Sequence, residues 1–415
     1  MRIAFLCGNL QPGKDGVGDY SRLLAAELAR QGHRCLLVAL NDRWLSDSSK
    51  RRTWDTPDSF SPDGRPVSGE LRLAAILSWK ERMERVRETL DSFQPDVISL
   101  QFVPYAFHDK GLVGGFARHL LDLLTTREKG AGTIHVMCHE LWLGGRSSLP
   151  VRQRLVGSVQ RSAILKMLGG FSPGTVVHTS NTHYRNRLQR GGIKGVRTLP
   201  LFGNIPVEDG AEHEWLFSRL HEAGIETKVD SRGDYLIGGF FGSLQPYDWS
   251  AEPLLGCLIR AAECNCRRLV LLSAGRIGTA GAAEWDRLTS RYAEHIAFVH
   301  FGEMESAQLS QYLSLLDFGL ASTRLSVIGK SGAVAAMLEH GIPVLCSYTD
   351  LAPEAGVGME DDARAENLLF RSDQPDFEDR VAAGLPHLEP VSRLREIACR
   401  MLNDLNDTNG RTMAQ

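Results

Sequence analysis

The length, composition and charge of the chain exclude several classes of protein. It has 415 residues, more than the roughly 250 to 300 at which one hydrophobic core stops growing, so two domains are expected. A formal net charge of -3 and the lack of a long basic run give no electrostatic sign of nucleic-acid binding. The sequence contains neither an apolar run of about 18 residues nor a signal-peptide pattern at its start. We therefore expect a soluble, cytoplasmic protein without a transmembrane segment, for which peripheral membrane contact stays open.

The cysteines predict a reducing compartment and no metal centre. They are scattered along the chain, mostly within apolar segments, where reduced thiols behave as small hydrophobic side chains. Cys264 and Cys266 are separated by one residue and have no second pair at the spacing of a zinc site. The acidic run of Glu360, Asp361 and Asp362 is interpreted as a solvated loop. No metal ion and no other cofactor are therefore expected.

The first half of the chain alternates short apolar runs with amphipathic stretches, which is typical of buried parallel strands joined by helices. A helix is predicted from Asp19 to Arg30, because its apolar residues share one face and Gly32 follows at a C-cap position. Residues 45–70, rich in Ser, Asp, Pro and Arg, are predicted to form a loop or a mobile insertion and not a separate domain. The predicted strands are Ile3–Leu6, Cys35–Leu40, Val97–Leu100, Ile134–Met137 and Val176–His178.

A second series of strands follows a polar stretch at residues 208–233. The pattern predicts an α/β fold with two doubly wound domains, at residues 1–201 and 234–385, and a cleft between them. Residues 386–415 are expected to contain a helix, from Pro390 to Leu405, that packs back on the first domain. The predicted strands are Tyr235–Phe241, Leu269–Leu272, Ala297–Phe301, Phe318–Ala321 and Pro343–Cys346.

Two segments of the first domain carry candidate functional residues, judged by the rule that ligands bind beyond the carboxyl ends of parallel strands. Gly16 and Gly18 lie between the first strand and the first helix, where backbone N–H groups can approach an anion. A turn capped by Asp19 explains them equally well. His139 follows the run IHVMC, so its imidazole is expected at a strand end, where it can hydrogen-bond a sugar hydroxyl or a phosphate. The alternative for His139 is a structural role.

Two cationic side chains stand out in the second domain. Arg276 follows a predicted strand, and Lys330 lies in the segment IGKSG at the start of an amphipathic helix predicted to run to His340. Glycines, a lysine and a helix N-terminus together suit a diphosphate. The first glycine and the spacing of a nucleotide-hydrolysing P-loop are missing. The alternative is a solvated helix start that Ser331 caps.

Several segments of the chain form a pattern known from one enzyme family. They are MRIAFLCGNLQPGKDGVGDYSRLLAAELARQGHRCLLVAL, QPDVISLQFVPYAF, TIHVMCHELW, YLIGGFFGSL, RLVLLSAGR, FVHFGEMESAQLSQYLSLLDFGLAST and GKSGAVAAMLEHGIPVL. Together they resemble the retaining family-4 glycosyltransferases of the GT-B fold. The resemblance implies two Rossmann-like domains, with the nucleotide near Gly302, Glu303 and Met304 and its diphosphate at the helix after Lys330. It also implies that His139 lies at the site of sugar transfer.

The chain departs from this family in its donor site. Family members commonly carry two glutamates, one before and one inside the helix after Lys330, and those places hold Ile328 and Ala336 here. The family's basic loop after the first strand of the second domain has no cation in this chain. The residues in that loop are Ser243, Gln245 and Asp248. Arg276 and Lys330 are expected to supply the positive charge in another geometry.

These observations predict a hexosyltransferase-type glycosyltransferase that moves a sugar from a nucleotide-diphosphate sugar to an unknown acceptor. The resemblance implies retention of configuration without a required metal. Two alternatives stay open: a catalytically silent protein of the same fold that binds a nucleotide sugar or a partner as regulator or scaffold, and a sugar-nucleotide epimerase. The candidate catalytic residues are His139 and Asp19. The candidate donor-binding residues are Gly16, Gly18, Ser243, Arg276, Gly302, Glu303, Met304, Lys330 and Ser331.

Overall fold

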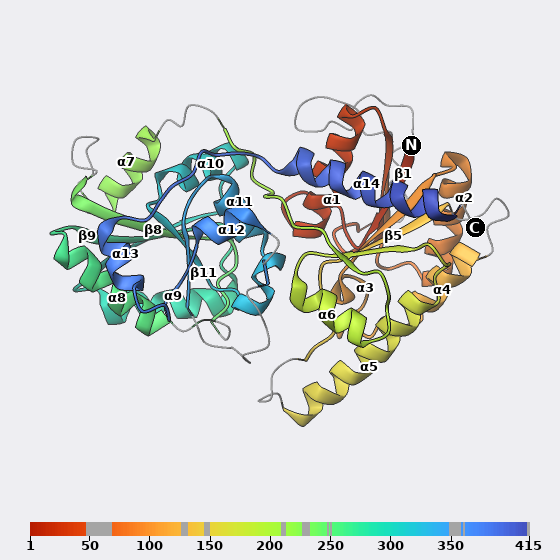
Figure 1. Cartoon of the computed structure of the whole chain (residues 1–415), viewed down its shortest axis with the longest axis horizontal. Helices are drawn as coiled ribbons and strands as arrows, with labels where there is room; N and C mark the ends of the chain where they lie inside the picture. Colours follow the sequence, from red (N-terminus) through yellow and green to blue (C-terminus); the bar gives the residue numbers. More distant parts are fainter. Residues whose placement is uncertain are drawn as a thin grey trace. The chain divides into compact units, whose positions relative to one another are not determined.

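In the computed structural model, the chain divides into two compact units. Unit 1 comprises Met1–Pro200 and Leu394–Gln415, and unit 2 comprises Leu201–Arg393. Each unit contains a parallel β-sheet with helices packed against it (Figure 1). The residues that the structure describes are 1–46, 69–125, 132–144, 150–208, 213–225, 233–246, 249, 251–347, 358–359 and 362–412.

The sheet of unit 1 has seven strands in the order β3-β2-β1-β4-β5-β6-β7. The direction of winding reverses between β1 and β4, which makes this the switch point of a doubly wound sheet. Every strand predicted for this half is present and is extended by at least one residue. The strands are β1 (Arg2–Cys7), β2 (Arg34–Asp42), β3 (Gly69–Ala74), β4 (Val97–Phe102), β5 (Thr133–Cys138), β6 (Val176–Thr179) and β7 (Arg197–Thr198).

The two edge strands of this sheet were not predicted. In β3, the half-buried Glu70 and Arg72 alternate with buried residues, so the strand has no continuous apolar run. An edge strand with one partly exposed face needs no such run. β7 has only two residues. Most of the segment predicted as a loop, residues 45–70, lies outside the described residues.

The last helix of the chain, α14 (Leu394–Thr412), belongs to unit 1 and packs against α1, β5 and β6 (Figure 1). A segment far away in sequence therefore covers the strands that lead toward His139. The other helices of unit 1 are α1 (Gly16–Arg30), α2 (Trp79–Phe93), α3 (Pro104–Phe107), α4 (Gly114–Thr125), α5 (Val151–Gly169) and α6 (Thr182–Arg190).

The sheet of unit 2 has six strands in the order β10-β9-β8-β11-β12-β13, with its switch point between β8 and β11. Neighbouring residues of β8, Leu236 and Ile237, belong to different core layers, so both faces of the sheet are buried. The predicted strands are all present, and the short β13 is additional. The strands are β8 (Tyr235–Phe241), β9 (Arg268–Ala274), β10 (Ile296–Gly302), β11 (Phe318–Ala321), β12 (Val344–Cys346) and β13 (Leu369–Arg371).

The helices of unit 2 cover both faces of this sheet. They are α7 (Glu214–Glu222), α8 (Ala251–Cys264), α9 (Gly278–Tyr292), α10 (Ser306–Leu315), α11 (Gly332–Glu339), α12 (Ala363–Leu368) and α13 (Phe377–Ala383). A 3-10 helix, η2 (Leu325–Lys330), directly precedes α11. The carboxyl ends of β8 and β11 thus lead into the segments that contain the candidate donor-binding residues.

Candidate active site

Three neighbouring strands of unit 2 end in the same way. Gly242, Gly275 and Gly302 follow or close β8, β9 and β10 with φ of +77°, +85° and +75°, a conformation that glycine adopts without strain. The backbone N–H of Gly275 donates to the carbonyl oxygen of Gly302 at 2.7 Å, which ties adjacent loops together. A ligand can approach the backbone closely at glycines of this kind. The side chains that come next in sequence are those of Ser243, Arg276 and Glu303.

Two side chains of opposite charge at this edge form an exposed ion pair. Arg276 Nε lies 3.8 Å from Glu303 Oε1, and the two side chains are 46% and 64% exposed. An ion pair this exposed contributes little to stability, but the carboxylate reduces the positive charge that Arg276 offers to an anion. Ser243 Oγ accepts a hydrogen bond from the side-chain amide of Gln245 at 2.6 Å. Met304, farther along the same edge, packs against the core of unit 2.

A serine bridges the switch point of the unit 2 sheet. Ser322, directly after β11, accepts a hydrogen bond from the backbone N–H of Gln245 at 3.0 Å and donates one to the carbonyl oxygen of Ser243 at 3.3 Å. The loop after β8 and the segment that leads to Lys330 are therefore joined where such sheets bind ligands. Sequence reasoning missed Ser322, because a serine after a short apolar run carries no distinctive signal.

Lys330 and Ser331 lie at the N-terminus of α11. Lys330 is the last residue of η2 and is half-buried. Ser331 is the N-cap of α11, and its Oγ accepts a hydrogen bond from the Val334 N–H at 3.3 Å. The first turn of a helix has further N–H groups without intrahelical partners, and the helix dipole makes this end partly positive. Donors, dipole and lysine together suit a diphosphate.

The interior of α11 differs from the prediction of an amphipathic helix. Its residues from Val334 to Glu339 are all buried, and His340 is the C-cap, so α11 is a core helix. Ile328 and Ala336, which stand where members of the family that the sequence resembles commonly have glutamates, are both 0% exposed. A carboxylate at either place would be buried in apolar surroundings at a large cost in free energy. Both positions therefore belong to the core of unit 2.

In unit 1, α1 begins at Gly16, earlier than predicted, and Asp15 rather than Asp19 is its N-cap. Asp15 accepts a hydrogen bond from a first-turn N–H at 3.1 Å, and Asp19 accepts one from the Gly13 N–H at 3.1 Å. Gly16 and Gly18 thus belong to the helix and not to a loop. Two carboxylates already occupy this helix N-terminus, so it suits a phosphate less well than the start of α11 does.

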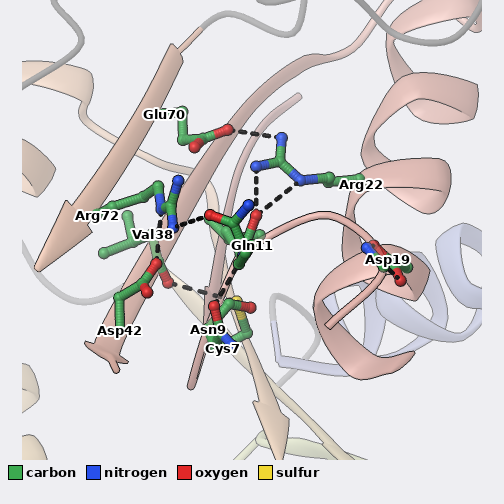
Figure 2. Close-up of polar contacts among 11 residues, drawn as sticks. Cys7, Asn9, Gln11, Asp19, Arg22, Val38, Asp42, Glu70 and Arg72 are labelled. Atoms are coloured by element: carbon green, nitrogen blue, oxygen red, sulfur yellow. Dashed lines mark hydrogen bonds and ion pairs between the residues drawn. The ribbon is translucent and has the colours of Figure 1, made fainter. Parts of the chain in front are cut away.

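A network of ion pairs holds the loop between β1 and α1 (Figure 2). Arg22 of α1 pairs with Glu70 of β3 at 2.6 Å and donates to a carbonyl oxygen of the loop at 2.6 Å. Arg72 of β3 pairs with Asp42 of β2 at 2.6 Å and donates to Gln11 Oε1 in the loop at 2.8 Å. These partners are far apart in sequence, so no local motif predicted them. They fix the loop against two neighbouring strands.

His139 lies directly after β5 and is buried, with 6% of its surface exposed. Its Nε2 is 2.9 Å from Gln101 Oε1, and its ring meets the ring of Tyr20 edge-on at a centroid distance of 5.0 Å. Burial lowers the pKa of His139 to about 3, so the imidazole is neutral at physiological pH. The ring is therefore suited to hydrogen bonding and not to proton donation from an imidazolium. Asp19, next to Tyr20, lies at the same edge of the sheet.

Several solved structures match the architecture of this chain over nearly its whole length. The catalytic domain of starch synthase IV from Arabidopsis thaliana, bound to ADP and acarbose, matches with a TM-score of 0.58 and 13% identity over 98% of this chain and 99% of that one. Sucrose-phosphate synthase from Thermosynechococcus elongatus matches with 0.56 and 14% over 99% and 100%. HepE from Anabaena, in complex with UDP and glucose, matches with 0.55 and 13% over 100% and 99%. The chain has the GT-B fold.

The GT-B fold confirms the predicted architecture of two Rossmann-like domains. No protein-family profile matches the chain, and no curated protein matches it by sequence. Identities of this size show the fold alone.

Within the part of the chain that the structure describes, no group of three or more His, Cys, Asp or Glu side chains could hold a metal ion. Asp362, predicted to lie in a solvated loop, is instead buried, where it caps α12 and pairs with Arg393. Among the described helices, none is long and apolar enough to cross a bilayer. Glu360, Asp361 and Asp248 lie outside the described residues.

Proposed function

We propose that this protein is a glycosyltransferase that binds a nucleotide-diphosphate sugar at the carboxyl edge of the unit 2 sheet. The observation that carries the proposal is the switch point of that sheet, where Ser322 joins the loop after β8 to the segment that leads into α11. A helix N-terminus with Lys330 beside it follows at once, and this combination favours a diphosphate. Proteins of the same fold include one crystallised with UDP and one with ADP.

The roles of the donor-side residues follow from their positions. Lys330, Ser331 and the first turn of α11 bind the diphosphate and stabilise the charge that builds on it as the sugar departs. Gly302, Glu303 and Met304 contribute backbone groups to the nucleotide, and Ser243 and Arg276 contact the donor from neighbouring loops. Fixed cationic and dipolar groups take the place of a metal ion in this proposal, and transfer proceeds with retention.

His139 of unit 1 acts on the sugar as a hydrogen-bond acceptor. The ring is neutral, and its Nε2 donates a hydrogen bond to Gln101 Oε1. Nδ1 is the second polar atom of the ring. An unprotonated Nδ1 accepts a hydrogen bond from a sugar hydroxyl, whereas it repels a phosphate oxygen. Asp19 contributes by accepting a hydrogen bond from the Gly13 N–H in the loop between β1 and α1, and not by transferring a proton.

The proposal is tested by ligand binding followed by turnover. Sugar nucleotides of the UDP, ADP and GDP series are screened by thermal shift, because a ligand that binds only the folded state must raise its melting temperature. Release of nucleoside diphosphate from the best ligand, by slow transfer of its sugar to water, is then measured with and without excess EDTA. We expect release under both conditions. Loss of release in EDTA, restored by Mg²⁺ or Mn²⁺, contradicts the metal-independent part of the proposal.

One observation favours a second candidate, a catalytically silent protein that binds a nucleotide sugar. The places of the two family glutamates are filled by the fully buried Ile328 and Ala336, so these residues present no carboxylate to a donor. This candidate predicts a thermal shift without any release of nucleoside diphosphate. A third outcome, interconversion of the sugar nucleotide without release, identifies an epimerase.

A further inference from the structure

One face of the unit 1 sheet carries a row of buried polar side chains. Ser99 and Gln101 alternate along β4, His135 lies on β5, and His178 lies on β6. Ser99 and His135 are direct register partners in the parallel ladder. All four are at most 1% exposed. Buried polar groups are costly unless they are hydrogen-bonded, so the contacts within this row define how each group is used.

The row forms an unbroken chain of hydrogen bonds from His139 to Asp404 on α14. Asp404 is anchored at its far side by Arg197, which donates to Oδ1. The links are His139 Nε2 to Gln101 Oε1 at 2.9 Å, Gln101 Nε2 to Ser99 Oγ at 2.7 Å, Ser99 Oγ to His135 Nδ1 at 2.8 Å, His135 Nε2 to His178 Nδ1 at 3.0 Å, and His178 Nε2 to Asp404 Oδ2 at 2.8 Å.

The carboxylate at one end determines the direction of every link. An ionised carboxylate only accepts, so His178 must donate from Nε2. Burial lowers the pKa of both His178 and His135, so each ring is neutral and has one donor and one acceptor nitrogen. His178 Nδ1 therefore accepts from His135 Nε2, and His135 Nδ1 accepts from the Ser99 hydroxyl.

The links from Ser99 to the sheet edge run in the same direction. The Ser99 oxygen, having donated its hydrogen, accepts from the amide nitrogen of Gln101. Gln101 then presents its oxygen to His139, and His139 must carry its hydrogen on Nε2. Each of the five links donates toward Asp404, and no group in the row needs a second proton.

We propose that Asp404 is a positioning residue that fixes His139 in the Nε2–H tautomer, so that Nδ1 faces the ligand as a hydrogen-bond acceptor. The tautomer of a histidine is set by the hydrogen bond of its other nitrogen, and here that bond is relayed across three strands. The identity of the ligand hydroxyl rests on the proposed function. The tautomer of His139 does not, and it can be measured without any activity.

Asp404→Asn tests the relay because it reverses the direction that Asp404 imposes. Arg197 keeps the amide oxygen of the new side chain on its own side, so the amide nitrogen faces His178 and donates to it. His178 and His135 then donate in the opposite direction, and the buried Ser99 hydroxyl needs a new acceptor, which the Gln101 amide provides by turning its oxygen toward Ser99. The Gln101 amide nitrogen then donates to His139 Nε2, and His139 becomes the Nδ1–H tautomer. Asp407, one turn farther along α14 and 3.9 Å from Arg197, provides the matched control Asp407→Asn.

The readout is the ¹⁵N NMR spectrum of histidine-labelled protein, in which protonated and unprotonated ring nitrogens are well separated. The His139 signals are identified by their loss in His139→Gln. We expect Nε2–H in the wild type and in Asp407→Asn, and Nδ1–H in Asp404→Asn. Adding Ser99→Ala, which cuts the relay, should make the His139 tautomer insensitive to Asp404→Asn. An Nδ1–H tautomer in the wild type overturns the proposal, even if the Asp404 variant does not fold.

An activity measurement adds a second arm if the protein proves to be a transferase. Asp404→Asn should lower kcat/KM by about tenfold, the scale of one misdirected hydrogen bond, and should cause no further loss in a His139→Ala background. An equal loss in both backgrounds means that Asp404 acts on the fold and not through His139, and the proposal fails. If no transfer activity is found, the proposed function is wrong, but the NMR result on the His139 tautomer remains valid.

Discussion

The two residues with the most specific proposed roles differ in how strongly their surroundings constrain them. His139 is buried and its Nε2 is committed to Gln101, so its neutral state and orientation are set by the protein. Lys330 is half-buried at the junction between η2 and α11, beside the cap residue Ser331. The ammonium group is a point charge on a flexible stem, so its position relative to a diphosphate depends on the ligand.

Lys330→Ala should weaken the binding of a nucleoside diphosphate by about 10- to 100-fold, the value of one charge-assisted contact. Binding of the bare nucleoside should change much less, since the nucleoside has no phosphate. Calorimetry with both ligands checks this, with Lys330→Arg expected as a partial rescue and the exposed Lys166→Ala on α5 as control. If Lys330→Ala binds both ligands as the wild type does, Arg276 is the next anchor to test.

The neutral state of His139 should appear in the pH dependence of stability. Its pKa is about 3 when folded and 6.5 when unfolded, so its contribution is complete above pH 6.5 and is lost as the pH falls toward 3. Between pH 6.5 and 4.5 the wild type should lose roughly 2 to 3 kcal/mol relative to His139→Gln. Urea unfolding at several pH values measures the difference. The exposed His108→Gln serves as control, and equal slopes for the wild type and His139→Gln would refute the expectation.

At the scale of elements, two helices begin at candidate sites with the same dipole but with different charges around it. The start of α1 carries Asp15 and Asp19, both of which accept hydrogen bonds from nearby backbone N–H groups. The start of α11 carries Lys330 and the neutral Ser331. Because each helix N-terminus is partly positive, the flanking side chains decide which one attracts an anion, and here they favour α11.

Gly18 of α1 is needed for packing, so Gly18→Ala should destabilise unit 1. A Cβ atom at this position would lie 2.4 Å from the backbone oxygen of Asn9, closer than any real contact. The resulting shift should cost about 1 to 3 kcal/mol, more than the helix gains from alanine. The control is Gly115→Ala in α4, where a Cβ atom meets nothing within 4 Å, so that the free energy of unfolding should stay the same or rise. Chemical unfolding of both variants and the wild type measures the difference. A Gly18→Ala variant as stable as the wild type would contradict the prediction and show that the loop containing Asn9 shifts at little cost.

At the scale of the whole molecule, both chain segments that cross between the units are bound by one side chain of α11. The chain enters unit 2 after Pro200 and leaves it before Leu394. The Glu339 carboxylate accepts hydrogen bonds from the backbone N–H groups of Gly203 and Arg393, the latter at 3.1 Å. The helix that starts at the proposed diphosphate site thus ends at the two crossing segments.

Glu339 should make the protein less stable as the pH rises. Burial raises its pKa to about 7, above 4.5 in the unfolded chain, so its stabilising contribution is complete below pH 4.5 and is lost as the pH rises through 7. Relative to Glu339→Gln, the wild type should lose about 2 to 3 kcal/mol between pH 4.5 and 8. Urea unfolding of both proteins at these pH values checks the sign. Glu389→Gln, at an exposed position of the same returning segment, serves as the control. A wild type that gains stability relative to Glu339→Gln as the pH rises would contradict the assignment.

The sequence by itself determined the two doubly wound domains, because buried parallel strands are mostly near-continuous apolar runs and these are visible without any structure. It also singled out His139 and Lys330, which stand next to such runs. Only the tertiary structure decided what surrounds them. The row from Gln101 to Asp404, the Ser322 bridge and the buried Ile328 depend on contacts between segments far apart in the chain. Local patterns carry no information about such partners, since packing alone brings them together.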